Sequence, residues 1–266
     1  MQKLFMVMTA LSLTLFAYSD LDMDGVDDLV DQCPNTPLTE LVDIKGCTVR
    51  SLESPHHYDI IMGASYSQID YNTQASADTL TGTLQVDYYY KSFSLLASTS
   101  YYSTDSQDNG LNDSFIGAYY QFIPLESLRL RVGGGVRLPT YDSSLNNNNT
   151  DYSASASLSY TLKNINLFGS YSYTLINDDD VENVAYYQNT NAYSAGIGFY
   201  PTDRLYTSIA YNGSDSIYQN VETIELASLY LFYSIDSHWF TTFSYARGLS
   251  DSASDNYGAV RLGYYF

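Results

Sequence analysis

The sequence is poor in positive charge, cysteine, tryptophan and histidine. Its 266 residues include 11 Lys and Arg against 30 Asp and Glu, which gives a formal net charge of −19. Nucleic-acid binding requires clustered Lys and Arg to neutralise phosphates, so we expect no nucleic-acid partner. Sustained helical spacing of apolar residues is also missing after His57, which argues against a helical fold.

The N-terminus has the features of a secretory signal peptide. In MQKLFMVMTALSLTLFAYS, one Lys precedes an apolar run from Leu4 to Ala17, and small residues occupy Ala17 and Ser19. This pattern predicts a signal peptide over residues 1–19 and a mature chain that begins at Asp20. The alternative is an uncleaved N-terminal anchor.

The chain has only two cysteines, Cys33 and Cys47, which lie 14 positions apart. Export would place them in an oxidising compartment, where we predict that they form a disulfide with each other. Closing a loop of this length stabilises a small segment by roughly 3 kcal/mol on the chain-entropy account. Free thiols and a metal site are the alternatives, although no His lies near either Cys.

Alternation of apolar and polar residues is the dominant pattern after the cysteines. In YSASASLSYTL, Ala154, Ala156 and Leu158 fall on one face, while the other face is almost entirely serine. Such period-2 alternation predicts β-strands. About twelve runs show it: 57–70, 78–90, 93–104, 113–122, 127–139, 151–162, 165–176, 190–200, 204–213, 221–234, 238–248 and 256–266.

The polar face of these runs distinguishes two kinds of β protein. A soluble sandwich buries bulky aliphatics and exposes Lys, Glu and Thr, whereas here the runs contain few charges and the polar face is Ser, Gly, Thr and Tyr. This favours an all-β transmembrane antiparallel β-barrel of about twelve strands over residues 57–266, with lipid outside and a polar lumen. A soluble periplasmic β protein is the alternative. Short turns, predicted at 91–92, 124–126, 163–164, 201–203 and 235–237, alternate with long acidic or Asn-rich loops. The even strand count places both chain ends on the short-turn, periplasmic side.

The C-terminal decapeptide YGAVRLGYYF ends on Phe266, with Tyr264, Leu262 and Val260 at every second position before it. It resembles the terminal β-signal of bacterial outer-membrane proteins. The resemblance implies that the barrel-assembly machinery recognises Phe266 and Tyr264. It also implies insertion among the lipids of a Gram-negative outer membrane.

An acidic stretch, SDLDMDGVDDLVDQCPNTP, directly follows the predicted signal peptide. Its spacing matches a twelve-position calcium loop that begins at Asp20. Gly25 occupies the sharp turn, and oxygen-bearing residues occupy the ligand positions of the loop. Position 12 is Asp rather than the longer Glu, and no helical pattern flanks the loop. The expected calcium ligands are Asp20, Asp22, Asp24, the Val26 carbonyl, Asp28 and Asp31.

Residues 20–47, with these aspartates, the following Cys-Pro and the second Cys after a Gly, resemble a thrombospondin type 3 repeat found in some OmpA-type porins. The resemblance implies calcium binding. Here the repeat would precede the barrel, on its periplasmic side, joined to it by a linker over 48–56. The alternative is an acidic leader that binds calcium weakly or not at all.

Catalysis finds little support in the sequence. Outer-membrane phospholipases and proteases need a histidine on the extracellular side, and the expected topology puts His56, His57 and His238 on the periplasmic side. We therefore expect no enzyme.

Arginines give a better indication of function. The alternation in LRLRVGGGVRLP points Arg129, Arg131 and Arg137 toward the lumen, and in the last run Arg261 also faces inward. Basic groups in a lumen favour anionic solutes. The sequence therefore predicts a porin-like passive channel for small hydrophilic solutes, including anionic ones. Two alternatives remain: the arginines brace a closed barrel by pairing with lumen carboxylates such as Asp59, Asp87 or Glu225, and the protein is a non-transporting structural or surface protein with a plugged lumen.

Overall fold

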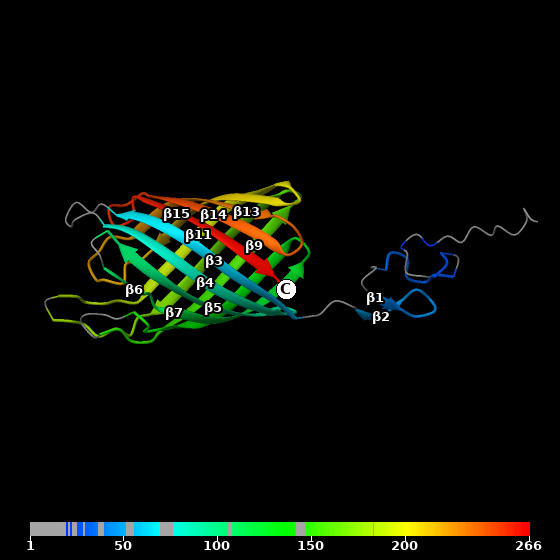
Figure 1. Cartoon of the computed structure of the whole chain (residues 1–266), viewed down its shortest axis with the longest axis horizontal. Coiled ribbons are helices and arrows are strands. Elements are labelled where there is room, and N and C mark those ends of the chain that lie inside the picture. The colour runs from blue at the N-terminus through cyan, green and yellow to red at the C-terminus, as the bar shows by residue number, and fades with distance from the viewer. Residues whose placement is uncertain are drawn as a thin grey trace, which may run out of the picture. The chain divides into compact units, whose positions relative to one another are not determined.

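The protein, described by a computed structural model, consists of a β-barrel and a small N-terminal unit (Figure 1). The structure describes residues 20, 22, 26–28, 30–36, 40–51, 56–69, 77–105, 108–141, 147–182 and 184–266. The chain divides into two compact units between Pro55 and His56. No helix within the described ranges is long and apolar enough to cross a membrane.

The barrel unit is built from twelve long antiparallel strands and one short one. The short strand, β6, pairs with β5 in the connection that leads to β7. The ring closes because the last strand, β15, pairs with the first barrel strand, β3. The strands are β3 (His56–Ile69), β4 (Ala77–Tyr90), β5 (Phe93–Thr104), β6 (Asn109–Leu111), β7 (Ser114–Leu125), β8 (Leu128–Leu138), β9 (Asp151–Leu162), β10 (Ile165–Leu175), β11 (Thr190–Thr202), β12 (Leu205–Ser214), β13 (Ile224–Ser234), β14 (Trp239–Gly248) and β15 (Asn256–Tyr265).

All twelve predicted strands are present, and the all-β barrel fold is confirmed. Short turns connect the strands at one end, which we call the tight-turn end, and longer segments connect them at the other, the long-loop end. Both chain ends of the barrel lie at the tight-turn end, and Figure 1 shows the C-terminus there. The tight turns are 91–92, 126–127, 163–164, 203–204 and 235–238.

Two turns differ from the sequence prediction, which began them at Pro124 and Pro201. Both prolines lie inside strands, and the turns begin at Glu126 and Asp203. The register shifts at each proline, between Phe122 and Leu125 in β7 and between Phe199 and Thr202 in β11. An irregular register tolerates a residue without a backbone N–H, so proline ends the regular ladder here without ending the strand.

Apolar side chains cover the outside of the barrel rather than filling it. Leu158 on β9 and Val260 on β15 are 48% and 56% exposed. Among the described residues the buried apolar set consists only of Ala246, Ala253 and Ala259, and no large side chain is fully buried. An apolar exterior around an interior without a hydrophobic core is the arrangement of a barrel surrounded by lipid.

The N-terminal unit contains a two-stranded antiparallel hairpin of β1 (Glu40–Val42) and β2 (Thr48–Ser51). β2 lies within 48–56, the range that the sequence predicts as the connection between the repeat and the barrel. β2 begins at Thr48, directly after Cys47, so the disulfide holds the chain at the point where pairing with β1 starts.

Candidate functional site

The inward face of the barrel is lined mainly by small and polar side chains. In β9, half-buried serines alternate with exposed apolar residues, and similar small residues line the neighbouring strands. One interior cavity is bordered by Ser170, Ser172, Ala192, Ser194 and Asn212, from β10, β11 and β12. Small polar groups leave room for water along this wall.

Aromatic rings lie flat on this wall where the opposite strand has glycine. The position that a Cβ would take at Gly133 is 2.4 Å from the Tyr119 ring, and at Gly263 it is 2.1 Å from the Phe240 ring. Each ring therefore occupies space that only glycine leaves open. The Arg131 guanidinium lies 4.1 Å from the centroid of the Tyr119 ring, so Gly133, Tyr119 and Arg131 pack together along the wall.

The structure places the four predicted lumen arginines on inward positions of β8 and β15. Arg129, Arg131 and Arg137 alternate with residues of the outward face, and Arg131 Nη2 donates a hydrogen bond to Ser94 Oγ on β5 (3.1 Å). Arg137 borders a cavity of about 760 Å³ at the long-loop end. Arg261 borders a second one, of about 370 Å³. The basic side chains are thus distributed along the lumen rather than gathered in one ring.

A pair of carboxylates lies on the inward face and borders the same cavity as Arg261. Asp59 on β3 and Asp87 on β4 are directly opposite each other in the register. Asp87 is only 5% exposed, and Gln85 Nε2 donates to its Oδ2 (2.8 Å). The Oδ1 atoms of both aspartates are buried and have no hydrogen-bond partner. We call Asp59 and Asp87 the acid pair.

The arginines do not brace the barrel through the carboxylates named in the sequence analysis. Among the described residues, no nitrogen–oxygen contact within 4.0 Å joins them to Asp59, Asp87 or Glu225. Glu225 shares the outward face of β13 with Ala227, because Tyr230 and Phe232 of that strand border the inner cavity. The lumen therefore contains charges of both signs that are not neutralised by direct pairing.

Loops at the long-loop end are hydrogen-bonded to one another. Asn147 Nδ2 donates to Tyr187 OH (2.8 Å), and the rings of Tyr187 and Tyr218 lie 5.3 Å apart. Gln219 Nε2 donates to the Tyr187 carbonyl (2.8 Å). Burial and the neighbouring Tyr187 raise the pKa of Tyr218. These contacts give the mouth of the lumen a defined shape.

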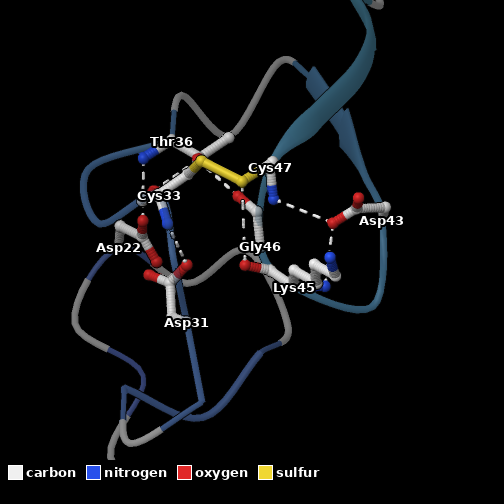
Figure 2. Close-up of a disulfide and its surroundings, with 8 residues drawn as sticks. All are labelled: Asp22, Asp31, Cys33, Thr36, Asp43, Lys45, Gly46 and Cys47. Carbon is white, nitrogen blue, oxygen red and sulfur yellow. Dashed lines mark hydrogen bonds between the residues drawn. A yellow bond between two sulfur atoms is a disulfide. The ribbon is translucent and has the colours of Figure 1, made fainter.

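The predicted disulfide between Cys33 and Cys47 is present, with the two Cα atoms 5.0 Å apart. Figure 2 shows that hydrogen bonds surround it. The buried Thr36 places its Oγ1 2.8 Å from both the Cys33 and the Gly46 carbonyl oxygens. The Thr36 N–H donates to Asp22 Oδ2 (2.7 Å), and the Cys33 N–H donates to Asp31 Oδ1 (2.8 Å). We call this arrangement the clasp.

The clasp includes two of the predicted calcium ligands, because Asp22 and Asp31 each accept a backbone hydrogen bond within it (Figure 2). Asp20 and Val26 are half-buried, and Asp28 is exposed. Asp24 and Gly25 lie outside the described residues. The described His, Cys, Asp and Glu residues do not by themselves form a group of three or more that could hold a metal. The oxygen-rich donor set fits calcium in chemistry, with two carboxylates in place.

Asp43 makes the hairpin of this unit sensitive to acid. Its Oδ1 accepts hydrogen bonds from the N–H groups of Lys45 (2.8 Å) and Cys47 (3.1 Å), which lower the pKa of Asp43. A carboxyl whose pKa is lower in the folded state than in the unfolded state stabilises the fold. Its contribution is complete at pH values above the unfolded pKa of about 3.9, and it is lost as the pH falls through the folded pKa.

We therefore expect the amide protons of Lys45 and Cys47 to lose protection from hydrogen exchange below about pH 4. Asp43→Ala should remove the protection at every pH. Protection that is unchanged between about pH 3 and 6 would show that Asp43 does not hold this turn.

The three histidines lie at the tight-turn end, as the topology predicted. His56 Nδ1 is 2.7 Å from Tyr88 OH, the His57 ring stacks on Tyr265 at 5.3 Å, and the His238 ring stacks on Tyr264 at 5.7 Å. Tyr264 also contacts Phe266, with ring centroids 4.6 Å apart. The Phe266 N–H donates to the Tyr58 carbonyl (2.9 Å). The two predicted assembly residues therefore lie in an aromatic cluster at the seam between β15 and β3.

Sequence reasoning missed the aromatic wall opposite the acid pair. Tyr230, Phe232 and Phe240 border the same cavity as Asp59 and Asp87. Residues 221–234 have apolar side chains at both odd and even positions, so alternation does not identify the inward face of β13.

Comparison with known proteins identifies the fold. No protein-family model and no curated protein sequence matches the chain. A solved outer-membrane channel from Pseudomonas putida F1 aligns with a TM-score of 0.67 and 12% identity, covering 80% of this chain and 97% of that one.

Two solved porins are also similar. NanC porin aligns with a TM-score of 0.54 and 14% identity over 79% of this chain and 98% of the porin. KdgM porin, solved in complex with disordered oligogalacturonate, aligns with a TM-score of 0.51 and 11% identity over the same shares. The chain therefore has the closed β-barrel fold of outer-membrane channels and porins.

Proposed function

We propose that the protein is a passive outer-membrane channel for small hydrophilic solutes, with a preference for anions. The observation that carries the proposal is the inward face, where small polar residues and four arginines surround a lumen without an apolar core. Water can fill such a lumen, and its basic groups attract anions. The similarity to a porin that was solved with an acidic oligosaccharide supports the same class of solute.

The proposal also includes a calcium-binding repeat on the periplasmic side. Asp20, Asp22, Asp24, Asp28, Asp31 and the Val26 carbonyl would hold the ion. Calcium would supply positive charge that draws these carboxylates together. The hydrogen bonds that hold Asp22 and Asp31 in the clasp support this assignment.

Membrane insertion is proposed to depend on the C-terminus. Phe266 and Tyr264 would be recognised by the barrel-assembly machinery, and the outward apolar band would contact outer-membrane lipid. The position of Phe266 at the seam supports a role in closing the barrel, because its N–H already bonds to β3.

Single-channel recording in planar bilayers tests the channel. We expect ohmic openings with an anion preference that falls in the double variant Arg129→Ser and Arg131→Ser. Removing one charge at close approach in water changes the energy of an anion by about 1 kcal/mol, so its partition should change by about five-fold per arginine. Arg247→Ser is the matched control, because Arg247 lies on the outward face of β14.

Two outcomes would contradict the proposal. Silent bilayers at adequate protein loading would favour the rival function, a structural or surface protein with a plugged lumen. Openings whose ion preference is the same in the double variant would show that the arginines do not select the solute.

A further inference from the structure

The acid pair combines two negative charges at one place on the lumen wall. Asp59 and Asp87 are directly opposite on neighbouring strands, where Cβ atoms are about 4.5–5.5 Å apart. Like charges in this arrangement destabilise a sheet. Arg131 supplies part of the compensating positive charge for Asp87, and a cation in the lumen would offset more of it when both carboxylates are ionised.

The protein supplies few donors to these carboxylates. Gln85 Nε2 bonds to Asp87 Oδ2 at 2.8 Å, and Tyr89 OH is 3.5 Å from the same oxygen. The Oδ1 atoms of both aspartates are buried without a hydrogen-bond partner, and Asp87 is 5% exposed. A buried carboxylate without a full set of donors is costly, so a positive charge that enters the adjoining cavity would offset the charge of the pair.

The surrounding cavity indicates the chemistry of that ligand. It measures about 370 Å³ and is bordered by both aspartates, by aromatic residues including Tyr230 and Phe232, and by Arg261. Aromatic faces attract cations, and a primary ammonium has three N–H donors for the free carboxylate oxygens. A guanidinium in the same cavity binds carboxylate or phosphate.

The side chain of Arg261 borders the same cavity as the acid pair. Its Cγ lies 2.6 Å from the position that a Cβ would take at Gly63, so the arginine crosses β3 where glycine leaves space. Gly63 is on the same inward face as Asp59. The Arg261 guanidinium, from β15, and the two carboxylates, from β3 and β4, therefore border one cavity.

We propose that this cavity binds the zwitterionic form of a small solute, with its primary ammonium on the acid pair and its anionic group on Arg261. The inference rests on the proposed channel and names the solute class that it selects. The aromatic wall favours an organic ammonium over an inorganic cation. The described acidic, His and Cys residues form no group of three or more that could hold a metal ion, which disfavours a divalent metal.

Calorimetry on the refolded full-length protein in detergent tests the site with three probes of equal chain length. 4-Aminobutyrate carries both charges, butylammonium only the positive one and butyrate only the negative one. We expect 4-aminobutyrate to bind most tightly and butyrate most weakly. The double variant Asp59→Asn and Asp87→Asn should weaken 4-aminobutyrate at least ten-fold, and Arg261→Ser should reduce it to the affinity of butylammonium.

Asp203→Asn is the matched control, because Asp203 is an exposed carboxylate in a tight turn and its loss should change nothing. Circular dichroism of each variant establishes that the barrel has folded. Failure of both ammonium probes to bind, equal binding to the double variant, or displacement of 4-aminobutyrate by potassium at equal concentration would overturn the site. Binding is measured without conduction, so silent bilayers with intact binding would contradict the channel alone, and conduction without binding would contradict this site alone.

Discussion

Replacing Leu158 with arginine is expected to lower the free energy of unfolding of the membrane-inserted barrel by about 2–4 kcal/mol. Leu158 is 48% exposed on the outward face of β9. A strand spans a bilayer with about 9–11 residues, and counting from the tight-turn end places Leu158 near the midplane. A charge there would enter hydrocarbon without a partner. Denaturant titration of the protein folded into lipid vesicles measures the effect.

The same charge on the inward face should be tolerated. Ser155→Arg is the control, since Ser155 lies on the inward face of the same strand, opposite Gly133 and Ser172. Ser157 is less suitable because it is opposite Arg131, and two like charges would repel. A similar loss of stability in both variants would show that the outward face of β9 does not contact lipid.

Opening the clasp is expected to weaken calcium binding by the N-terminal unit about 100-fold. The disulfide closes a segment with a sequence separation of 14, which corresponds to about 3 kcal/mol on the chain-entropy account. Without it, binding must also order the chain that carries Asp22 and Asp31. Calcium calorimetry on the full-length oxidised protein and on the double variant Cys33→Ser and Cys47→Ser compares the two affinities.

Two aspartate variants make this result specific. Asp24→Ala removes a predicted ligand and should weaken binding in the oxidised protein. Asp27→Asn removes a charge of the same stretch that the spacing does not assign as a ligand, and it should have little effect. If the oxidised protein releases no heat in millimolar calcium, the calcium proposal is wrong.

The sequence was most informative where one face of a strand differs sharply from the other. The serine alternation predicts β9 over 151–162, the bounds that the structure has. The alternation of Leu and Arg in LRLRVGGGVRLP likewise predicts the inward direction of Arg129 and Arg131. Proline was misleading: it indicates turns because it lacks an N–H, yet Pro124 and Pro201 occupy irregular strand positions where that N–H is not needed.

The acid pair illustrates what a single sequence does not contain. Asp59 and Asp87 become neighbours only through the register of β3 with β4. Their cavity is completed by residues of β13, β14 and β15, far along the chain. Such proximity depends on how the ring closes, and local alternation carries no information about it.

The glycines beneath the aromatic rings have a consequence for the width of the channel. A methyl group at Gly133 would meet the Tyr119 ring and the Ala118 carbonyl oxygen, 2.4 and 2.3 Å away. Because the oxygen belongs to the backbone, β7 would have to shift there together with the Tyr119 ring, against which Arg131 packs. The width of the lumen therefore depends on the absence of a side chain at these glycines. An alanine there would displace an aromatic ring from the wall and narrow the lumen without adding or removing a charge.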